Sequence, residues 1–192
     1  SELAYQQLLD QNAARRALHE AAKLEPVGLL ERPVTQFAYR DEAQMARDIS
    51  RAQLAAARLE PELQRVHDVL KNGEAGRAEL TRPRWQAGYD LAMGRALAAR
   101  ARVEGYNAML AALKRGRKFE SPTSSRWVLI PDDNIEAGSS YQRLVDKART
   151  YLERVTTEHA GTPWSRIAEK ELETKLGWNW TEQCQMKKHS RT

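Results

Sequence analysis

The chain has 192 residues, of which 30% are charged, 41% are hydrophobic and 7% are aromatic. This length suffices for one domain or two small ones and is too short for two large catalytic lobes. Ala, Arg, Glu, Gln and Leu dominate, which is typical of long, water-exposed helices. No apolar run approaches the ~18–20 residues that cross a bilayer, so a membrane span within this sequence is excluded.

The net charge of +5 comes from one part of the chain. Residues 81–120 contain nine basic and three acidic residues, a net charge of +6, whereas residues 1–80 have −2 and residues 121–192 have +1. An electrostatic partner is therefore expected at 81–120, although a solvated basic helix face explains the same pattern. The candidate basic interaction patch consists of Arg95, Arg102, Lys114, Arg115, Arg117 and Lys118.

Residues 3–24 are expected to form one helix, because alanines and long polar side chains fill this stretch and no helix breaker occurs before Pro26. Its apolar positions are sparse, so the helix needs a partner to be stable. The connector at 25–38 contains two prolines and a glycine, and Phe37 is expected to pack it down. Residues 1–40 are thus interpreted as an N-terminal helix with its connector.

A long apolar seam of helical period follows Asp41. Its apolar residues recur at alternating steps of four and three, the pattern of positions a and d in a coiled coil. Its members are Met45, Ile49, Ala52, Ala56, Leu59, Leu63, Val66 and Leu70. Pro61 falls inside the seam and predicts a kink or a short break, because proline lacks an N–H donor and clashes with the preceding turn. The seam predicts a helical segment over 41–71.

The clearest helix signal covers residues 84–115, which correspond to a helix about 48 Å long at ~1.5 Å per residue. Its seam positions are Trp85, Tyr89, Ala92, Ala96, Ala99, Val103, Tyr106, Leu110 and Leu113. Gly88, Gly94 and Gly105 lower helix propensity, which suggests close contacts with neighbours. Because 41–71 has nearly the same length, the two segments are expected to form a long antiparallel hairpin within 41–115.

Residues 116–138 are interpreted as a loop with an extended strap, because the apolar run 127–130 is short and ends at Pro131. No other stretch looks β-like, and one strand cannot make a sheet. Residues 139–182 predict a helix pair, 139–160 and 163–176, with Trp178 and Trp180 folding back onto the second helix.

This pair resembles one tetratricopeptide (TPR) unit, although a generic helical hairpin fits equally well. The fold is therefore predicted to be all-α, with one helical domain over 1–182 and a tail at 183–192. Six aromatic residues are expected to be structural: Trp85, Tyr89, Tyr106, Trp127, Trp164 and Trp178.

Motifs for catalysis and metal binding are missing from these 192 residues. The four histidines are not at metal-ligand spacing, and the sequence lacks the zinc-protease HExxH, phosphate-loop and GxSxG patterns. Cys184 is the only cysteine, so neither an intrachain disulfide nor a cysteine metal cluster is possible. We therefore expect no catalytic residue, no cofactor and no metal in this sequence.

One family resemblance rests on motifs spread over most of residues 40–180. In order, they are 59–63 (LEPEL), 83–94 (PRWQAGYDLAMG), 104–110 (EGYNAML), 127–131 (WVLIP), 158–164 (EHAGTPW) and 176–178 (LGW). Together they resemble the helical C-terminal region of large bacterial proteins that have a von Willebrand factor type A domain upstream. The resemblance implies that cation binding belongs to that upstream domain, whose Asp-x-Ser-x-Ser motif is not found here. An accessory helical module is what the family implies for this chain.

The sequence thus favours a non-enzymatic module for protein–protein interaction or scaffolding. The partner is expected to be another protein or the upstream domain of a longer parent chain, and pairing of Ala-rich seams would also permit a homo-oligomer. Nucleic-acid binding through 95–118 is the alternative from another class. The basic cluster favours it, but such binding usually also requires a readable sequence motif, and none is present. A third alternative is an enzyme whose site is completed by a domain outside this sequence. The absence of an initiator Met and of a targeting signal leaves the localisation open.

Overall fold

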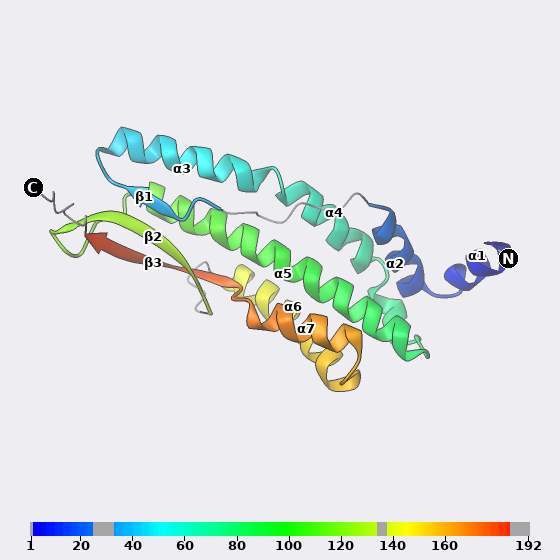
Figure 1. The fold of residues 1–192 in the computed structure, drawn as a ribbon. Helices are drawn as coiled ribbons and strands as arrows, with labels where there is room; N and C mark the ends of the chain where they lie inside the picture. The colour runs from blue at the N-terminus through cyan, green and yellow to red at the C-terminus, as the bar shows by residue number, and fades with distance from the viewer. Residues whose placement is uncertain (1, 25–32, 134–137, 185–192) are drawn as a thin grey trace, which may run out of the picture.

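The computed structural model describes residues 2–24, 33–133 and 138–184, arranged around one long helix (Figure 1). This helix, α5 (Pro83–Lys114), confirms the prediction over 84–115 to within one residue at each end. Half of its 32 residues are buried, which is more than one seam provides. Neighbours therefore cover α5 on several sides, and it forms the centre of the molecule.

Two consecutive helices, α3 (Glu42–Ala57) and α4 (Glu60–Lys71), run antiparallel to α5 along one of its sides (Figure 1). Pro61 stands in the first turn of α4, where its missing N–H group costs no helix bond. The break predicted at Pro61 is therefore confirmed. The buried apolar residues of both helices, among them Ile49 and Leu70, face the central helix and its neighbours.

The single helix expected over 3–24 is wrong, because the chain forms two helices, α1 (Glu2–Asp10) and α2 (Ala13–Lys23). Asn12 separates them with an extended backbone, and its side-chain oxygen accepts two backbone N–H groups of the first turn of α2 at 2.9 and 3.1 Å. Its side-chain amide also donates to the carbonyl of Gly76 at 2.8 Å. This capped start and the tertiary bond outweigh the local helix propensity at the junction.

The all-α prediction is wrong, because the structure contains a three-stranded antiparallel sheet in the order β1-β2-β3. The strands are β1 (Gln36–Ala38), β2 (Ser124–Asp132) and β3 (Gly177–Cys184), and they lie beside the C-terminal half of α5 (Figure 1). The run expected as a lone strap, 127–130, lies in the central strand. Its two partners come from the N-terminal connector and the C-terminal end of the described chain.

The register of the sheet places bulky side chains side by side. Phe37 lies opposite Trp127, and Leu129 lies opposite Trp180. All four side chains are at most 5% exposed and belong to one apolar cluster. The last strand ends at Cys184 and so includes the first two residues of the segment predicted as a tail, whose other residues lie outside the described ranges.

The sheet is attached to α5 through two tryptophans of β3. The indole N–H of Trp178 donates to the carbonyl oxygen of Arg102 at 3.0 Å, and that of Trp180 donates to the carbonyl oxygen of Met109 at 3.2 Å. The ring of Trp178 also lies 5.6 Å from that of Tyr106. These tryptophans therefore pack on the central helix, and the prediction that they fold back onto the last helix is wrong.

Helix α6 (Ser139–Glu158) packs closely against α5 at two of its glycines. A Cβ atom added at Gly94 would lie 2.7 Å from Cγ of Leu152, and one added at Gly105 would lie 2.6 Å from Cζ of Tyr141. Real Cβ atoms do not approach other heavy atoms so closely. The close contacts predicted for these two glycines are therefore confirmed.

The last helix, α7 (Pro163–Glu173), packs antiparallel to α6. Its N-cap is Thr162, whose hydroxyl accepts the backbone N–H of Ser165 at 3.3 Å, as expected for a Thr-Pro helix start. The likeness of the α6–α7 pair to a TPR unit stays a prediction. Nowhere in the described part of the chain is a helix both long and apolar enough to cross a bilayer.

Candidate functional site

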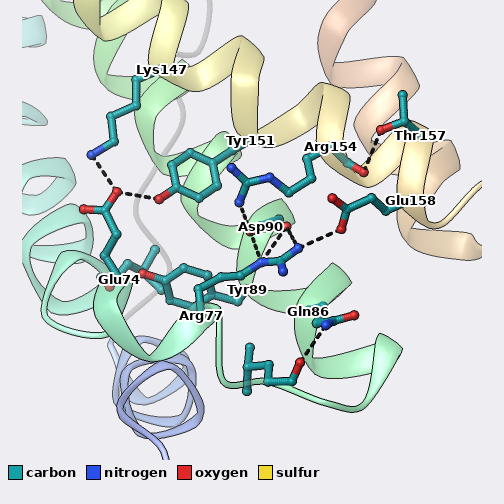
Figure 2. A network of polar contacts seen from close by, with 12 residues as sticks. Glu74, Arg77, Gln86, Tyr89, Asp90, Lys147, Tyr151, Arg154, Thr157 and Glu158 are labelled. Atoms are coloured by element: carbon teal, nitrogen blue, oxygen red, sulfur yellow. Dashed lines mark hydrogen bonds and ion pairs between the residues drawn. The ribbon is translucent and has the colours of Figure 1, made fainter.

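A buried network of charged side chains crosses the N-terminal half of α5 (Figure 2). Asp90 is fully buried, and its carboxylate accepts hydrogen bonds from Arg77 at 2.6–3.1 Å and from Arg154 at 3.2 Å. Arg77 lies in the short helix η1 (Glu74–Arg77) and also contacts Glu158 at 2.9 Å. One buried carboxylate thus joins η1, α5 and α6.

A second group of polar contacts lies beside the first and is centred on Glu74 (Figure 2). Its carboxylate accepts a hydrogen bond from the Tyr151 hydroxyl at 2.6 Å and pairs with the Lys147 ammonium at 2.8 Å. Burial raises the pKa of Glu74, but the hydrogen bonds from Lys147 and Tyr151 outweigh it, and the net pKa lies below the usual value. Burial and the bond to Glu74 both raise the pKa of Tyr151. Glu74 is therefore charged at neutral pH.

The chemistry of this network is that of a structural element. The Asp90 carboxylate faces two guanidinium groups, and Arg77 has its pKa raised mainly by the hydrogen bond to Asp90. Guanidinium groups do not exchange protons near neutral pH, so the pairing offers no acid–base step. Sequence reasoning missed Asp90, although one signal was present: it is the single charged residue in the stretch 85–94, where an unpaired charge would be costly.

The second candidate is a pocket of about 680 Å³ at the C-terminal end of α5, here called the α5-end pocket. The first half of α3 lines it with Glu42 and with an apolar wall of Met45, Ala46 and Ile49. The segment 113–119 and the aromatic rings of Tyr39 and Trp127 complete the lining. Its volume lies within the ~300–1,000 Å³ that is common for ligand pockets.

Four of the six residues in the predicted basic patch lie together at this pocket: Lys114, Arg115, Arg117 and Lys118. All four are exposed. Gly116, with φ of +103°, allows the chain to turn there, and its N–H closes the helix by donating to the Leu113 carbonyl at 3.1 Å. Cations at a helix C-terminus also offset its partial negative charge, which is a purely structural reason for such residues.

The aromatic part of the α5-end pocket is already ordered by contacts within the chain. Phe119 stacks on Trp127 with ring centroids 4.8 Å apart and an interplanar angle of 11°, and Tyr39 meets Phe119 edge-on at 6.0 Å. The guanidinium of Arg117 lies 5.3 Å from the centre of the Trp127 ring. Trp127 is only 3% exposed. These contacts hold segment 116–119 against the sheet.

A carboxylate on β3 holds the far end of the same segment. Glu182 accepts the backbone N–H of Glu120 at 2.6 Å and that of Ser121 at 3.2 Å. The bond from Glu120 is the main reason why the pKa of Glu182 lies below its usual value. The segment that bears the pocket's cations is therefore attached at one end to α5 and at the other to the sheet.

The remaining two residues of the predicted basic patch lie elsewhere. Arg95 and Arg102 both contact Glu171 on α7, at 3.5 and 2.6 Å. Along α5, Arg102 is about 18 Å from Lys114 at ~1.5 Å per residue. The structure therefore divides the predicted patch into a pair neutralised by α7 and a group of four at the pocket.

The residues expected to be structural lie mostly in the interior. Tyr89, Tyr106, Trp127 and Trp178 are buried, and Trp85 and Trp164 are partly buried. Burial raises the pKa of Tyr106 to about 12, while its hydroxyl donates to the Val34 carbonyl at 2.7 Å.

Other reactive side chains do not converge on a site. Cys184 is exposed, and its sulfur lies 3.3 Å from the Thr123 hydroxyl oxygen. In the ranges that the structure describes, no group of three or more His, Cys, Asp or Glu side chains is arranged to hold a metal ion. Sequence reasoning missed Tyr39, Glu42 and Glu182 at the α5-end pocket, because their place depends on contacts between distant segments.

Comparison with known proteins identifies no relative: no family model, no curated protein and no solved structure matches the chain. The resemblance to regions that accompany von Willebrand factor type A domains therefore stays a prediction.

Proposed function

We propose that this protein is a non-enzymatic interaction module that binds a protein segment in the α5-end pocket. One observation carries the proposal: the pocket combines an apolar wall on α3 with a cationic edge after α5, and contacts to the sheet hold the cationic segment in place. A pocket with an apolar surface and a few directed polar groups is the usual form of a binding site. A role as accessory region of a larger protein with a von Willebrand factor type A domain belongs to the same proposal.

The ionisable groups of the pocket support binding over catalysis. Its lining contains one carboxylate, Glu42, and four cations. General acid–base catalysis most often uses a histidine, and this lining contains none. The buried network around Asp90 supplies rigidity, because it ties the central helix to its neighbours far from the pocket.

Self-association through the Ala-rich seam of α5 receives no support from the packing. Among the seam alanines, Ala96 is 8% exposed, and Ala92 and Ala99 are partly buried against apolar clusters of the same chain. A second copy would therefore need another surface.

The test of the proposed function is selection of peptides from a random peptide display library on the immobilised, purified protein. We expect sequences to be enriched over a bare matrix, and we expect the synthetic peptides to bind in solution. A matched selection on the Ala46→Trp variant, whose new ring would fill the pocket, should lose that enrichment. Failure to enrich any peptide on the unmodified protein contradicts the proposal.

Nucleic-acid binding through 95–118 remains the second candidate, and the four cations at the pocket are the observation in its favour. Phosphate contacts make such binding strongly salt-dependent. Titration with single-stranded RNA and duplex DNA at low salt tests it. Loss of binding when Lys114, Arg115, Arg117 and Lys118 are changed to Glu would favour nucleic acid, whereas no binding at low salt removes this alternative.

A further inference from the structure

We propose that the α5-end pocket recognises an acidic protein segment that has one bulky apolar side chain among its carboxylates. This inference rests on the proposed function and specifies the partner's chemistry. The apolar side chain would lie against Met45 and Ala46 of α3 and against Phe119, and the carboxylates would meet the cations of 114–118.

The apolar half of the argument comes from the wall on α3. Met45, Ala46, Ile49 and Leu113 line the pocket with aliphatic groups, of which Ile49 and Leu113 are buried below the surface, and Ala46 and Phe119 are the partly exposed apolar residues. An apolar anchor in such a pocket contributes most of the binding energy of typical peptide complexes. A ligand that consists of charge alone would make no use of the partly exposed Ala46 and Phe119.

The electrostatic half comes from the four cations at the pocket, of which two have contacts within the fold. Arg117 is placed over Trp127, and Lys114 donates to the Ser50 hydroxyl at 2.8 Å. For Arg115 and Lys118, the described residues contain no side chain within ion-pair distance. Guanidinium and ammonium groups at the edge of a pocket attract carboxylates and accelerate their association.

Two features favour a peptide over a nucleic acid. Single strands bind by stacking successive bases on free aromatic faces. In this pocket, however, Trp127 is covered by Phe119 and approached by Arg117. In addition, Arg95 and Arg102 are paired with α7, so the cations do not form a continuous track along α5.

The experiment is fluorescence anisotropy on the full 192-residue chain with a short fluorescein-labelled peptide in which a single Phe is flanked by Asp and Glu. The comparison probes are the same peptide with Asn and Gln in place of the acids, the acidic peptide with Ala in place of Phe, and an oligouridine of equal charge. We expect the first peptide to bind at least about tenfold more tightly than the other three, a difference that corresponds to about 1.4 kcal/mol.

Two variants locate the binding. Arg115→Glu together with Lys118→Glu should lower the affinity for the acidic peptide by about tenfold or more, because two attractions become repulsions. The matched control is Arg166→Glu with Lys170→Glu on the exposed face of α7, away from the pocket, which should leave the affinity within about twofold at moderate salt. Far-ultraviolet circular dichroism checks that each variant is folded.

The steric variant is Ala46→Trp, with Ala43→Trp on the exposed face of α3 as its control. Ala46→Trp should abolish peptide binding without changing any charge, and Ala43→Trp should not.

Each other outcome overturns the inference. If oligouridine binds, and if the charge reversal abolishes this binding while Ala46→Trp does not, the pocket is a nucleic-acid site. Peptide binding that neither variant affects would place the interaction elsewhere and would overturn both this inference and the assignment of the proposed function to the α5-end pocket. If the acidic peptide does not bind but the display library yields other sequences, the partner chemistry is wrong and the interaction function is right. If neither binds, both fail.

Discussion

The variant Asp90→Ala tests how much the buried network stabilises the fold. Asp90 is fully buried, whereas the side chain of Arg77 is 16% exposed and that of Arg154 is 33% exposed. Removing one partner of a buried ion pair typically costs about 3–5 kcal/mol, because the other charge is left without compensation. Here Arg77 keeps Glu158, and both guanidinium groups reach solvent, so we expect the lower end, about 3 kcal/mol.

This loss corresponds to a large shift in melting temperature. For chains of 150–250 residues, 1 kcal/mol lowers the midpoint by about 2–4 °C, so Asp90→Ala should lower it by about 6–12 °C. Urea unfolding followed by far-ultraviolet circular dichroism gives the free energy directly. The double variant with Arg154→Met should recover part of the loss, since Asp90→Ala removes the carboxylate that pairs with Arg154.

Asp133→Ala is the matched control, because Asp133 also faces two cations, Arg149 and Lys175, but is 52% exposed. Exposed pairs contribute about 0–1 kcal/mol. If Asp90→Ala and Asp133→Ala lower the stability equally, burial is not what makes the network important, and the reasoning is refuted.

Two further predictions concern helix packing and pH. Gly88→Ala should stabilise the protein by up to about 1 kcal/mol, because its new methyl group would have no neighbour closer than 3.9 Å. Gly105→Ala should destabilise it by about 1–3 kcal/mol, because its methyl group would overlap the buried ring of Tyr141; equal effects in urea unfolding would contradict this contrast. Burial and then Arg100, whose guanidinium donates to Nδ1 at 3.0 Å, lower the pKa of His67 below 6.5. The folded state thus binds fewer protons, so this stabilisation is complete above the unfolded pKa of about 6.5 and is lost as pH falls through the folded pKa. His67→Gln should flatten the decline of unfolding free energy below about pH 6.5, and an unchanged decline would exclude His67 as its source.

The helices could be located from the sequence because their signals are local. The seam over 84–115 located α5, and Pro61 marked the break between α3 and α4, since both effects act within a turn or two of one helix. The seam did not reveal how completely α5 is surrounded. Small residues such as alanine and glycine allow other helices to pack on one side of α5 or on several, so they do not distinguish the two arrangements.

The sheet could be predicted only in part. The alternation Trp178, Asn179, Trp180, Thr181 is a strand signal that points to β3. The three residues of β1 are too few to produce a pattern, and Phe37 becomes a strand residue only because Trp127 lies opposite it. Strand pairing joins segments far apart in sequence, which local periodicity does not encode.

For the site, the sequence by itself determined that a cationic cluster follows α5 and that motifs for metal or nucleophilic chemistry are missing from the 192 residues. Only the tertiary structure decided which cations act together. It pairs Arg95 and Arg102 with Glu171, and it sets Lys118 and its neighbours beside the apolar wall of α3. The physical reason is that charge and helical period are properties of a segment, whereas a pocket and an ion pair exist only where separate segments meet.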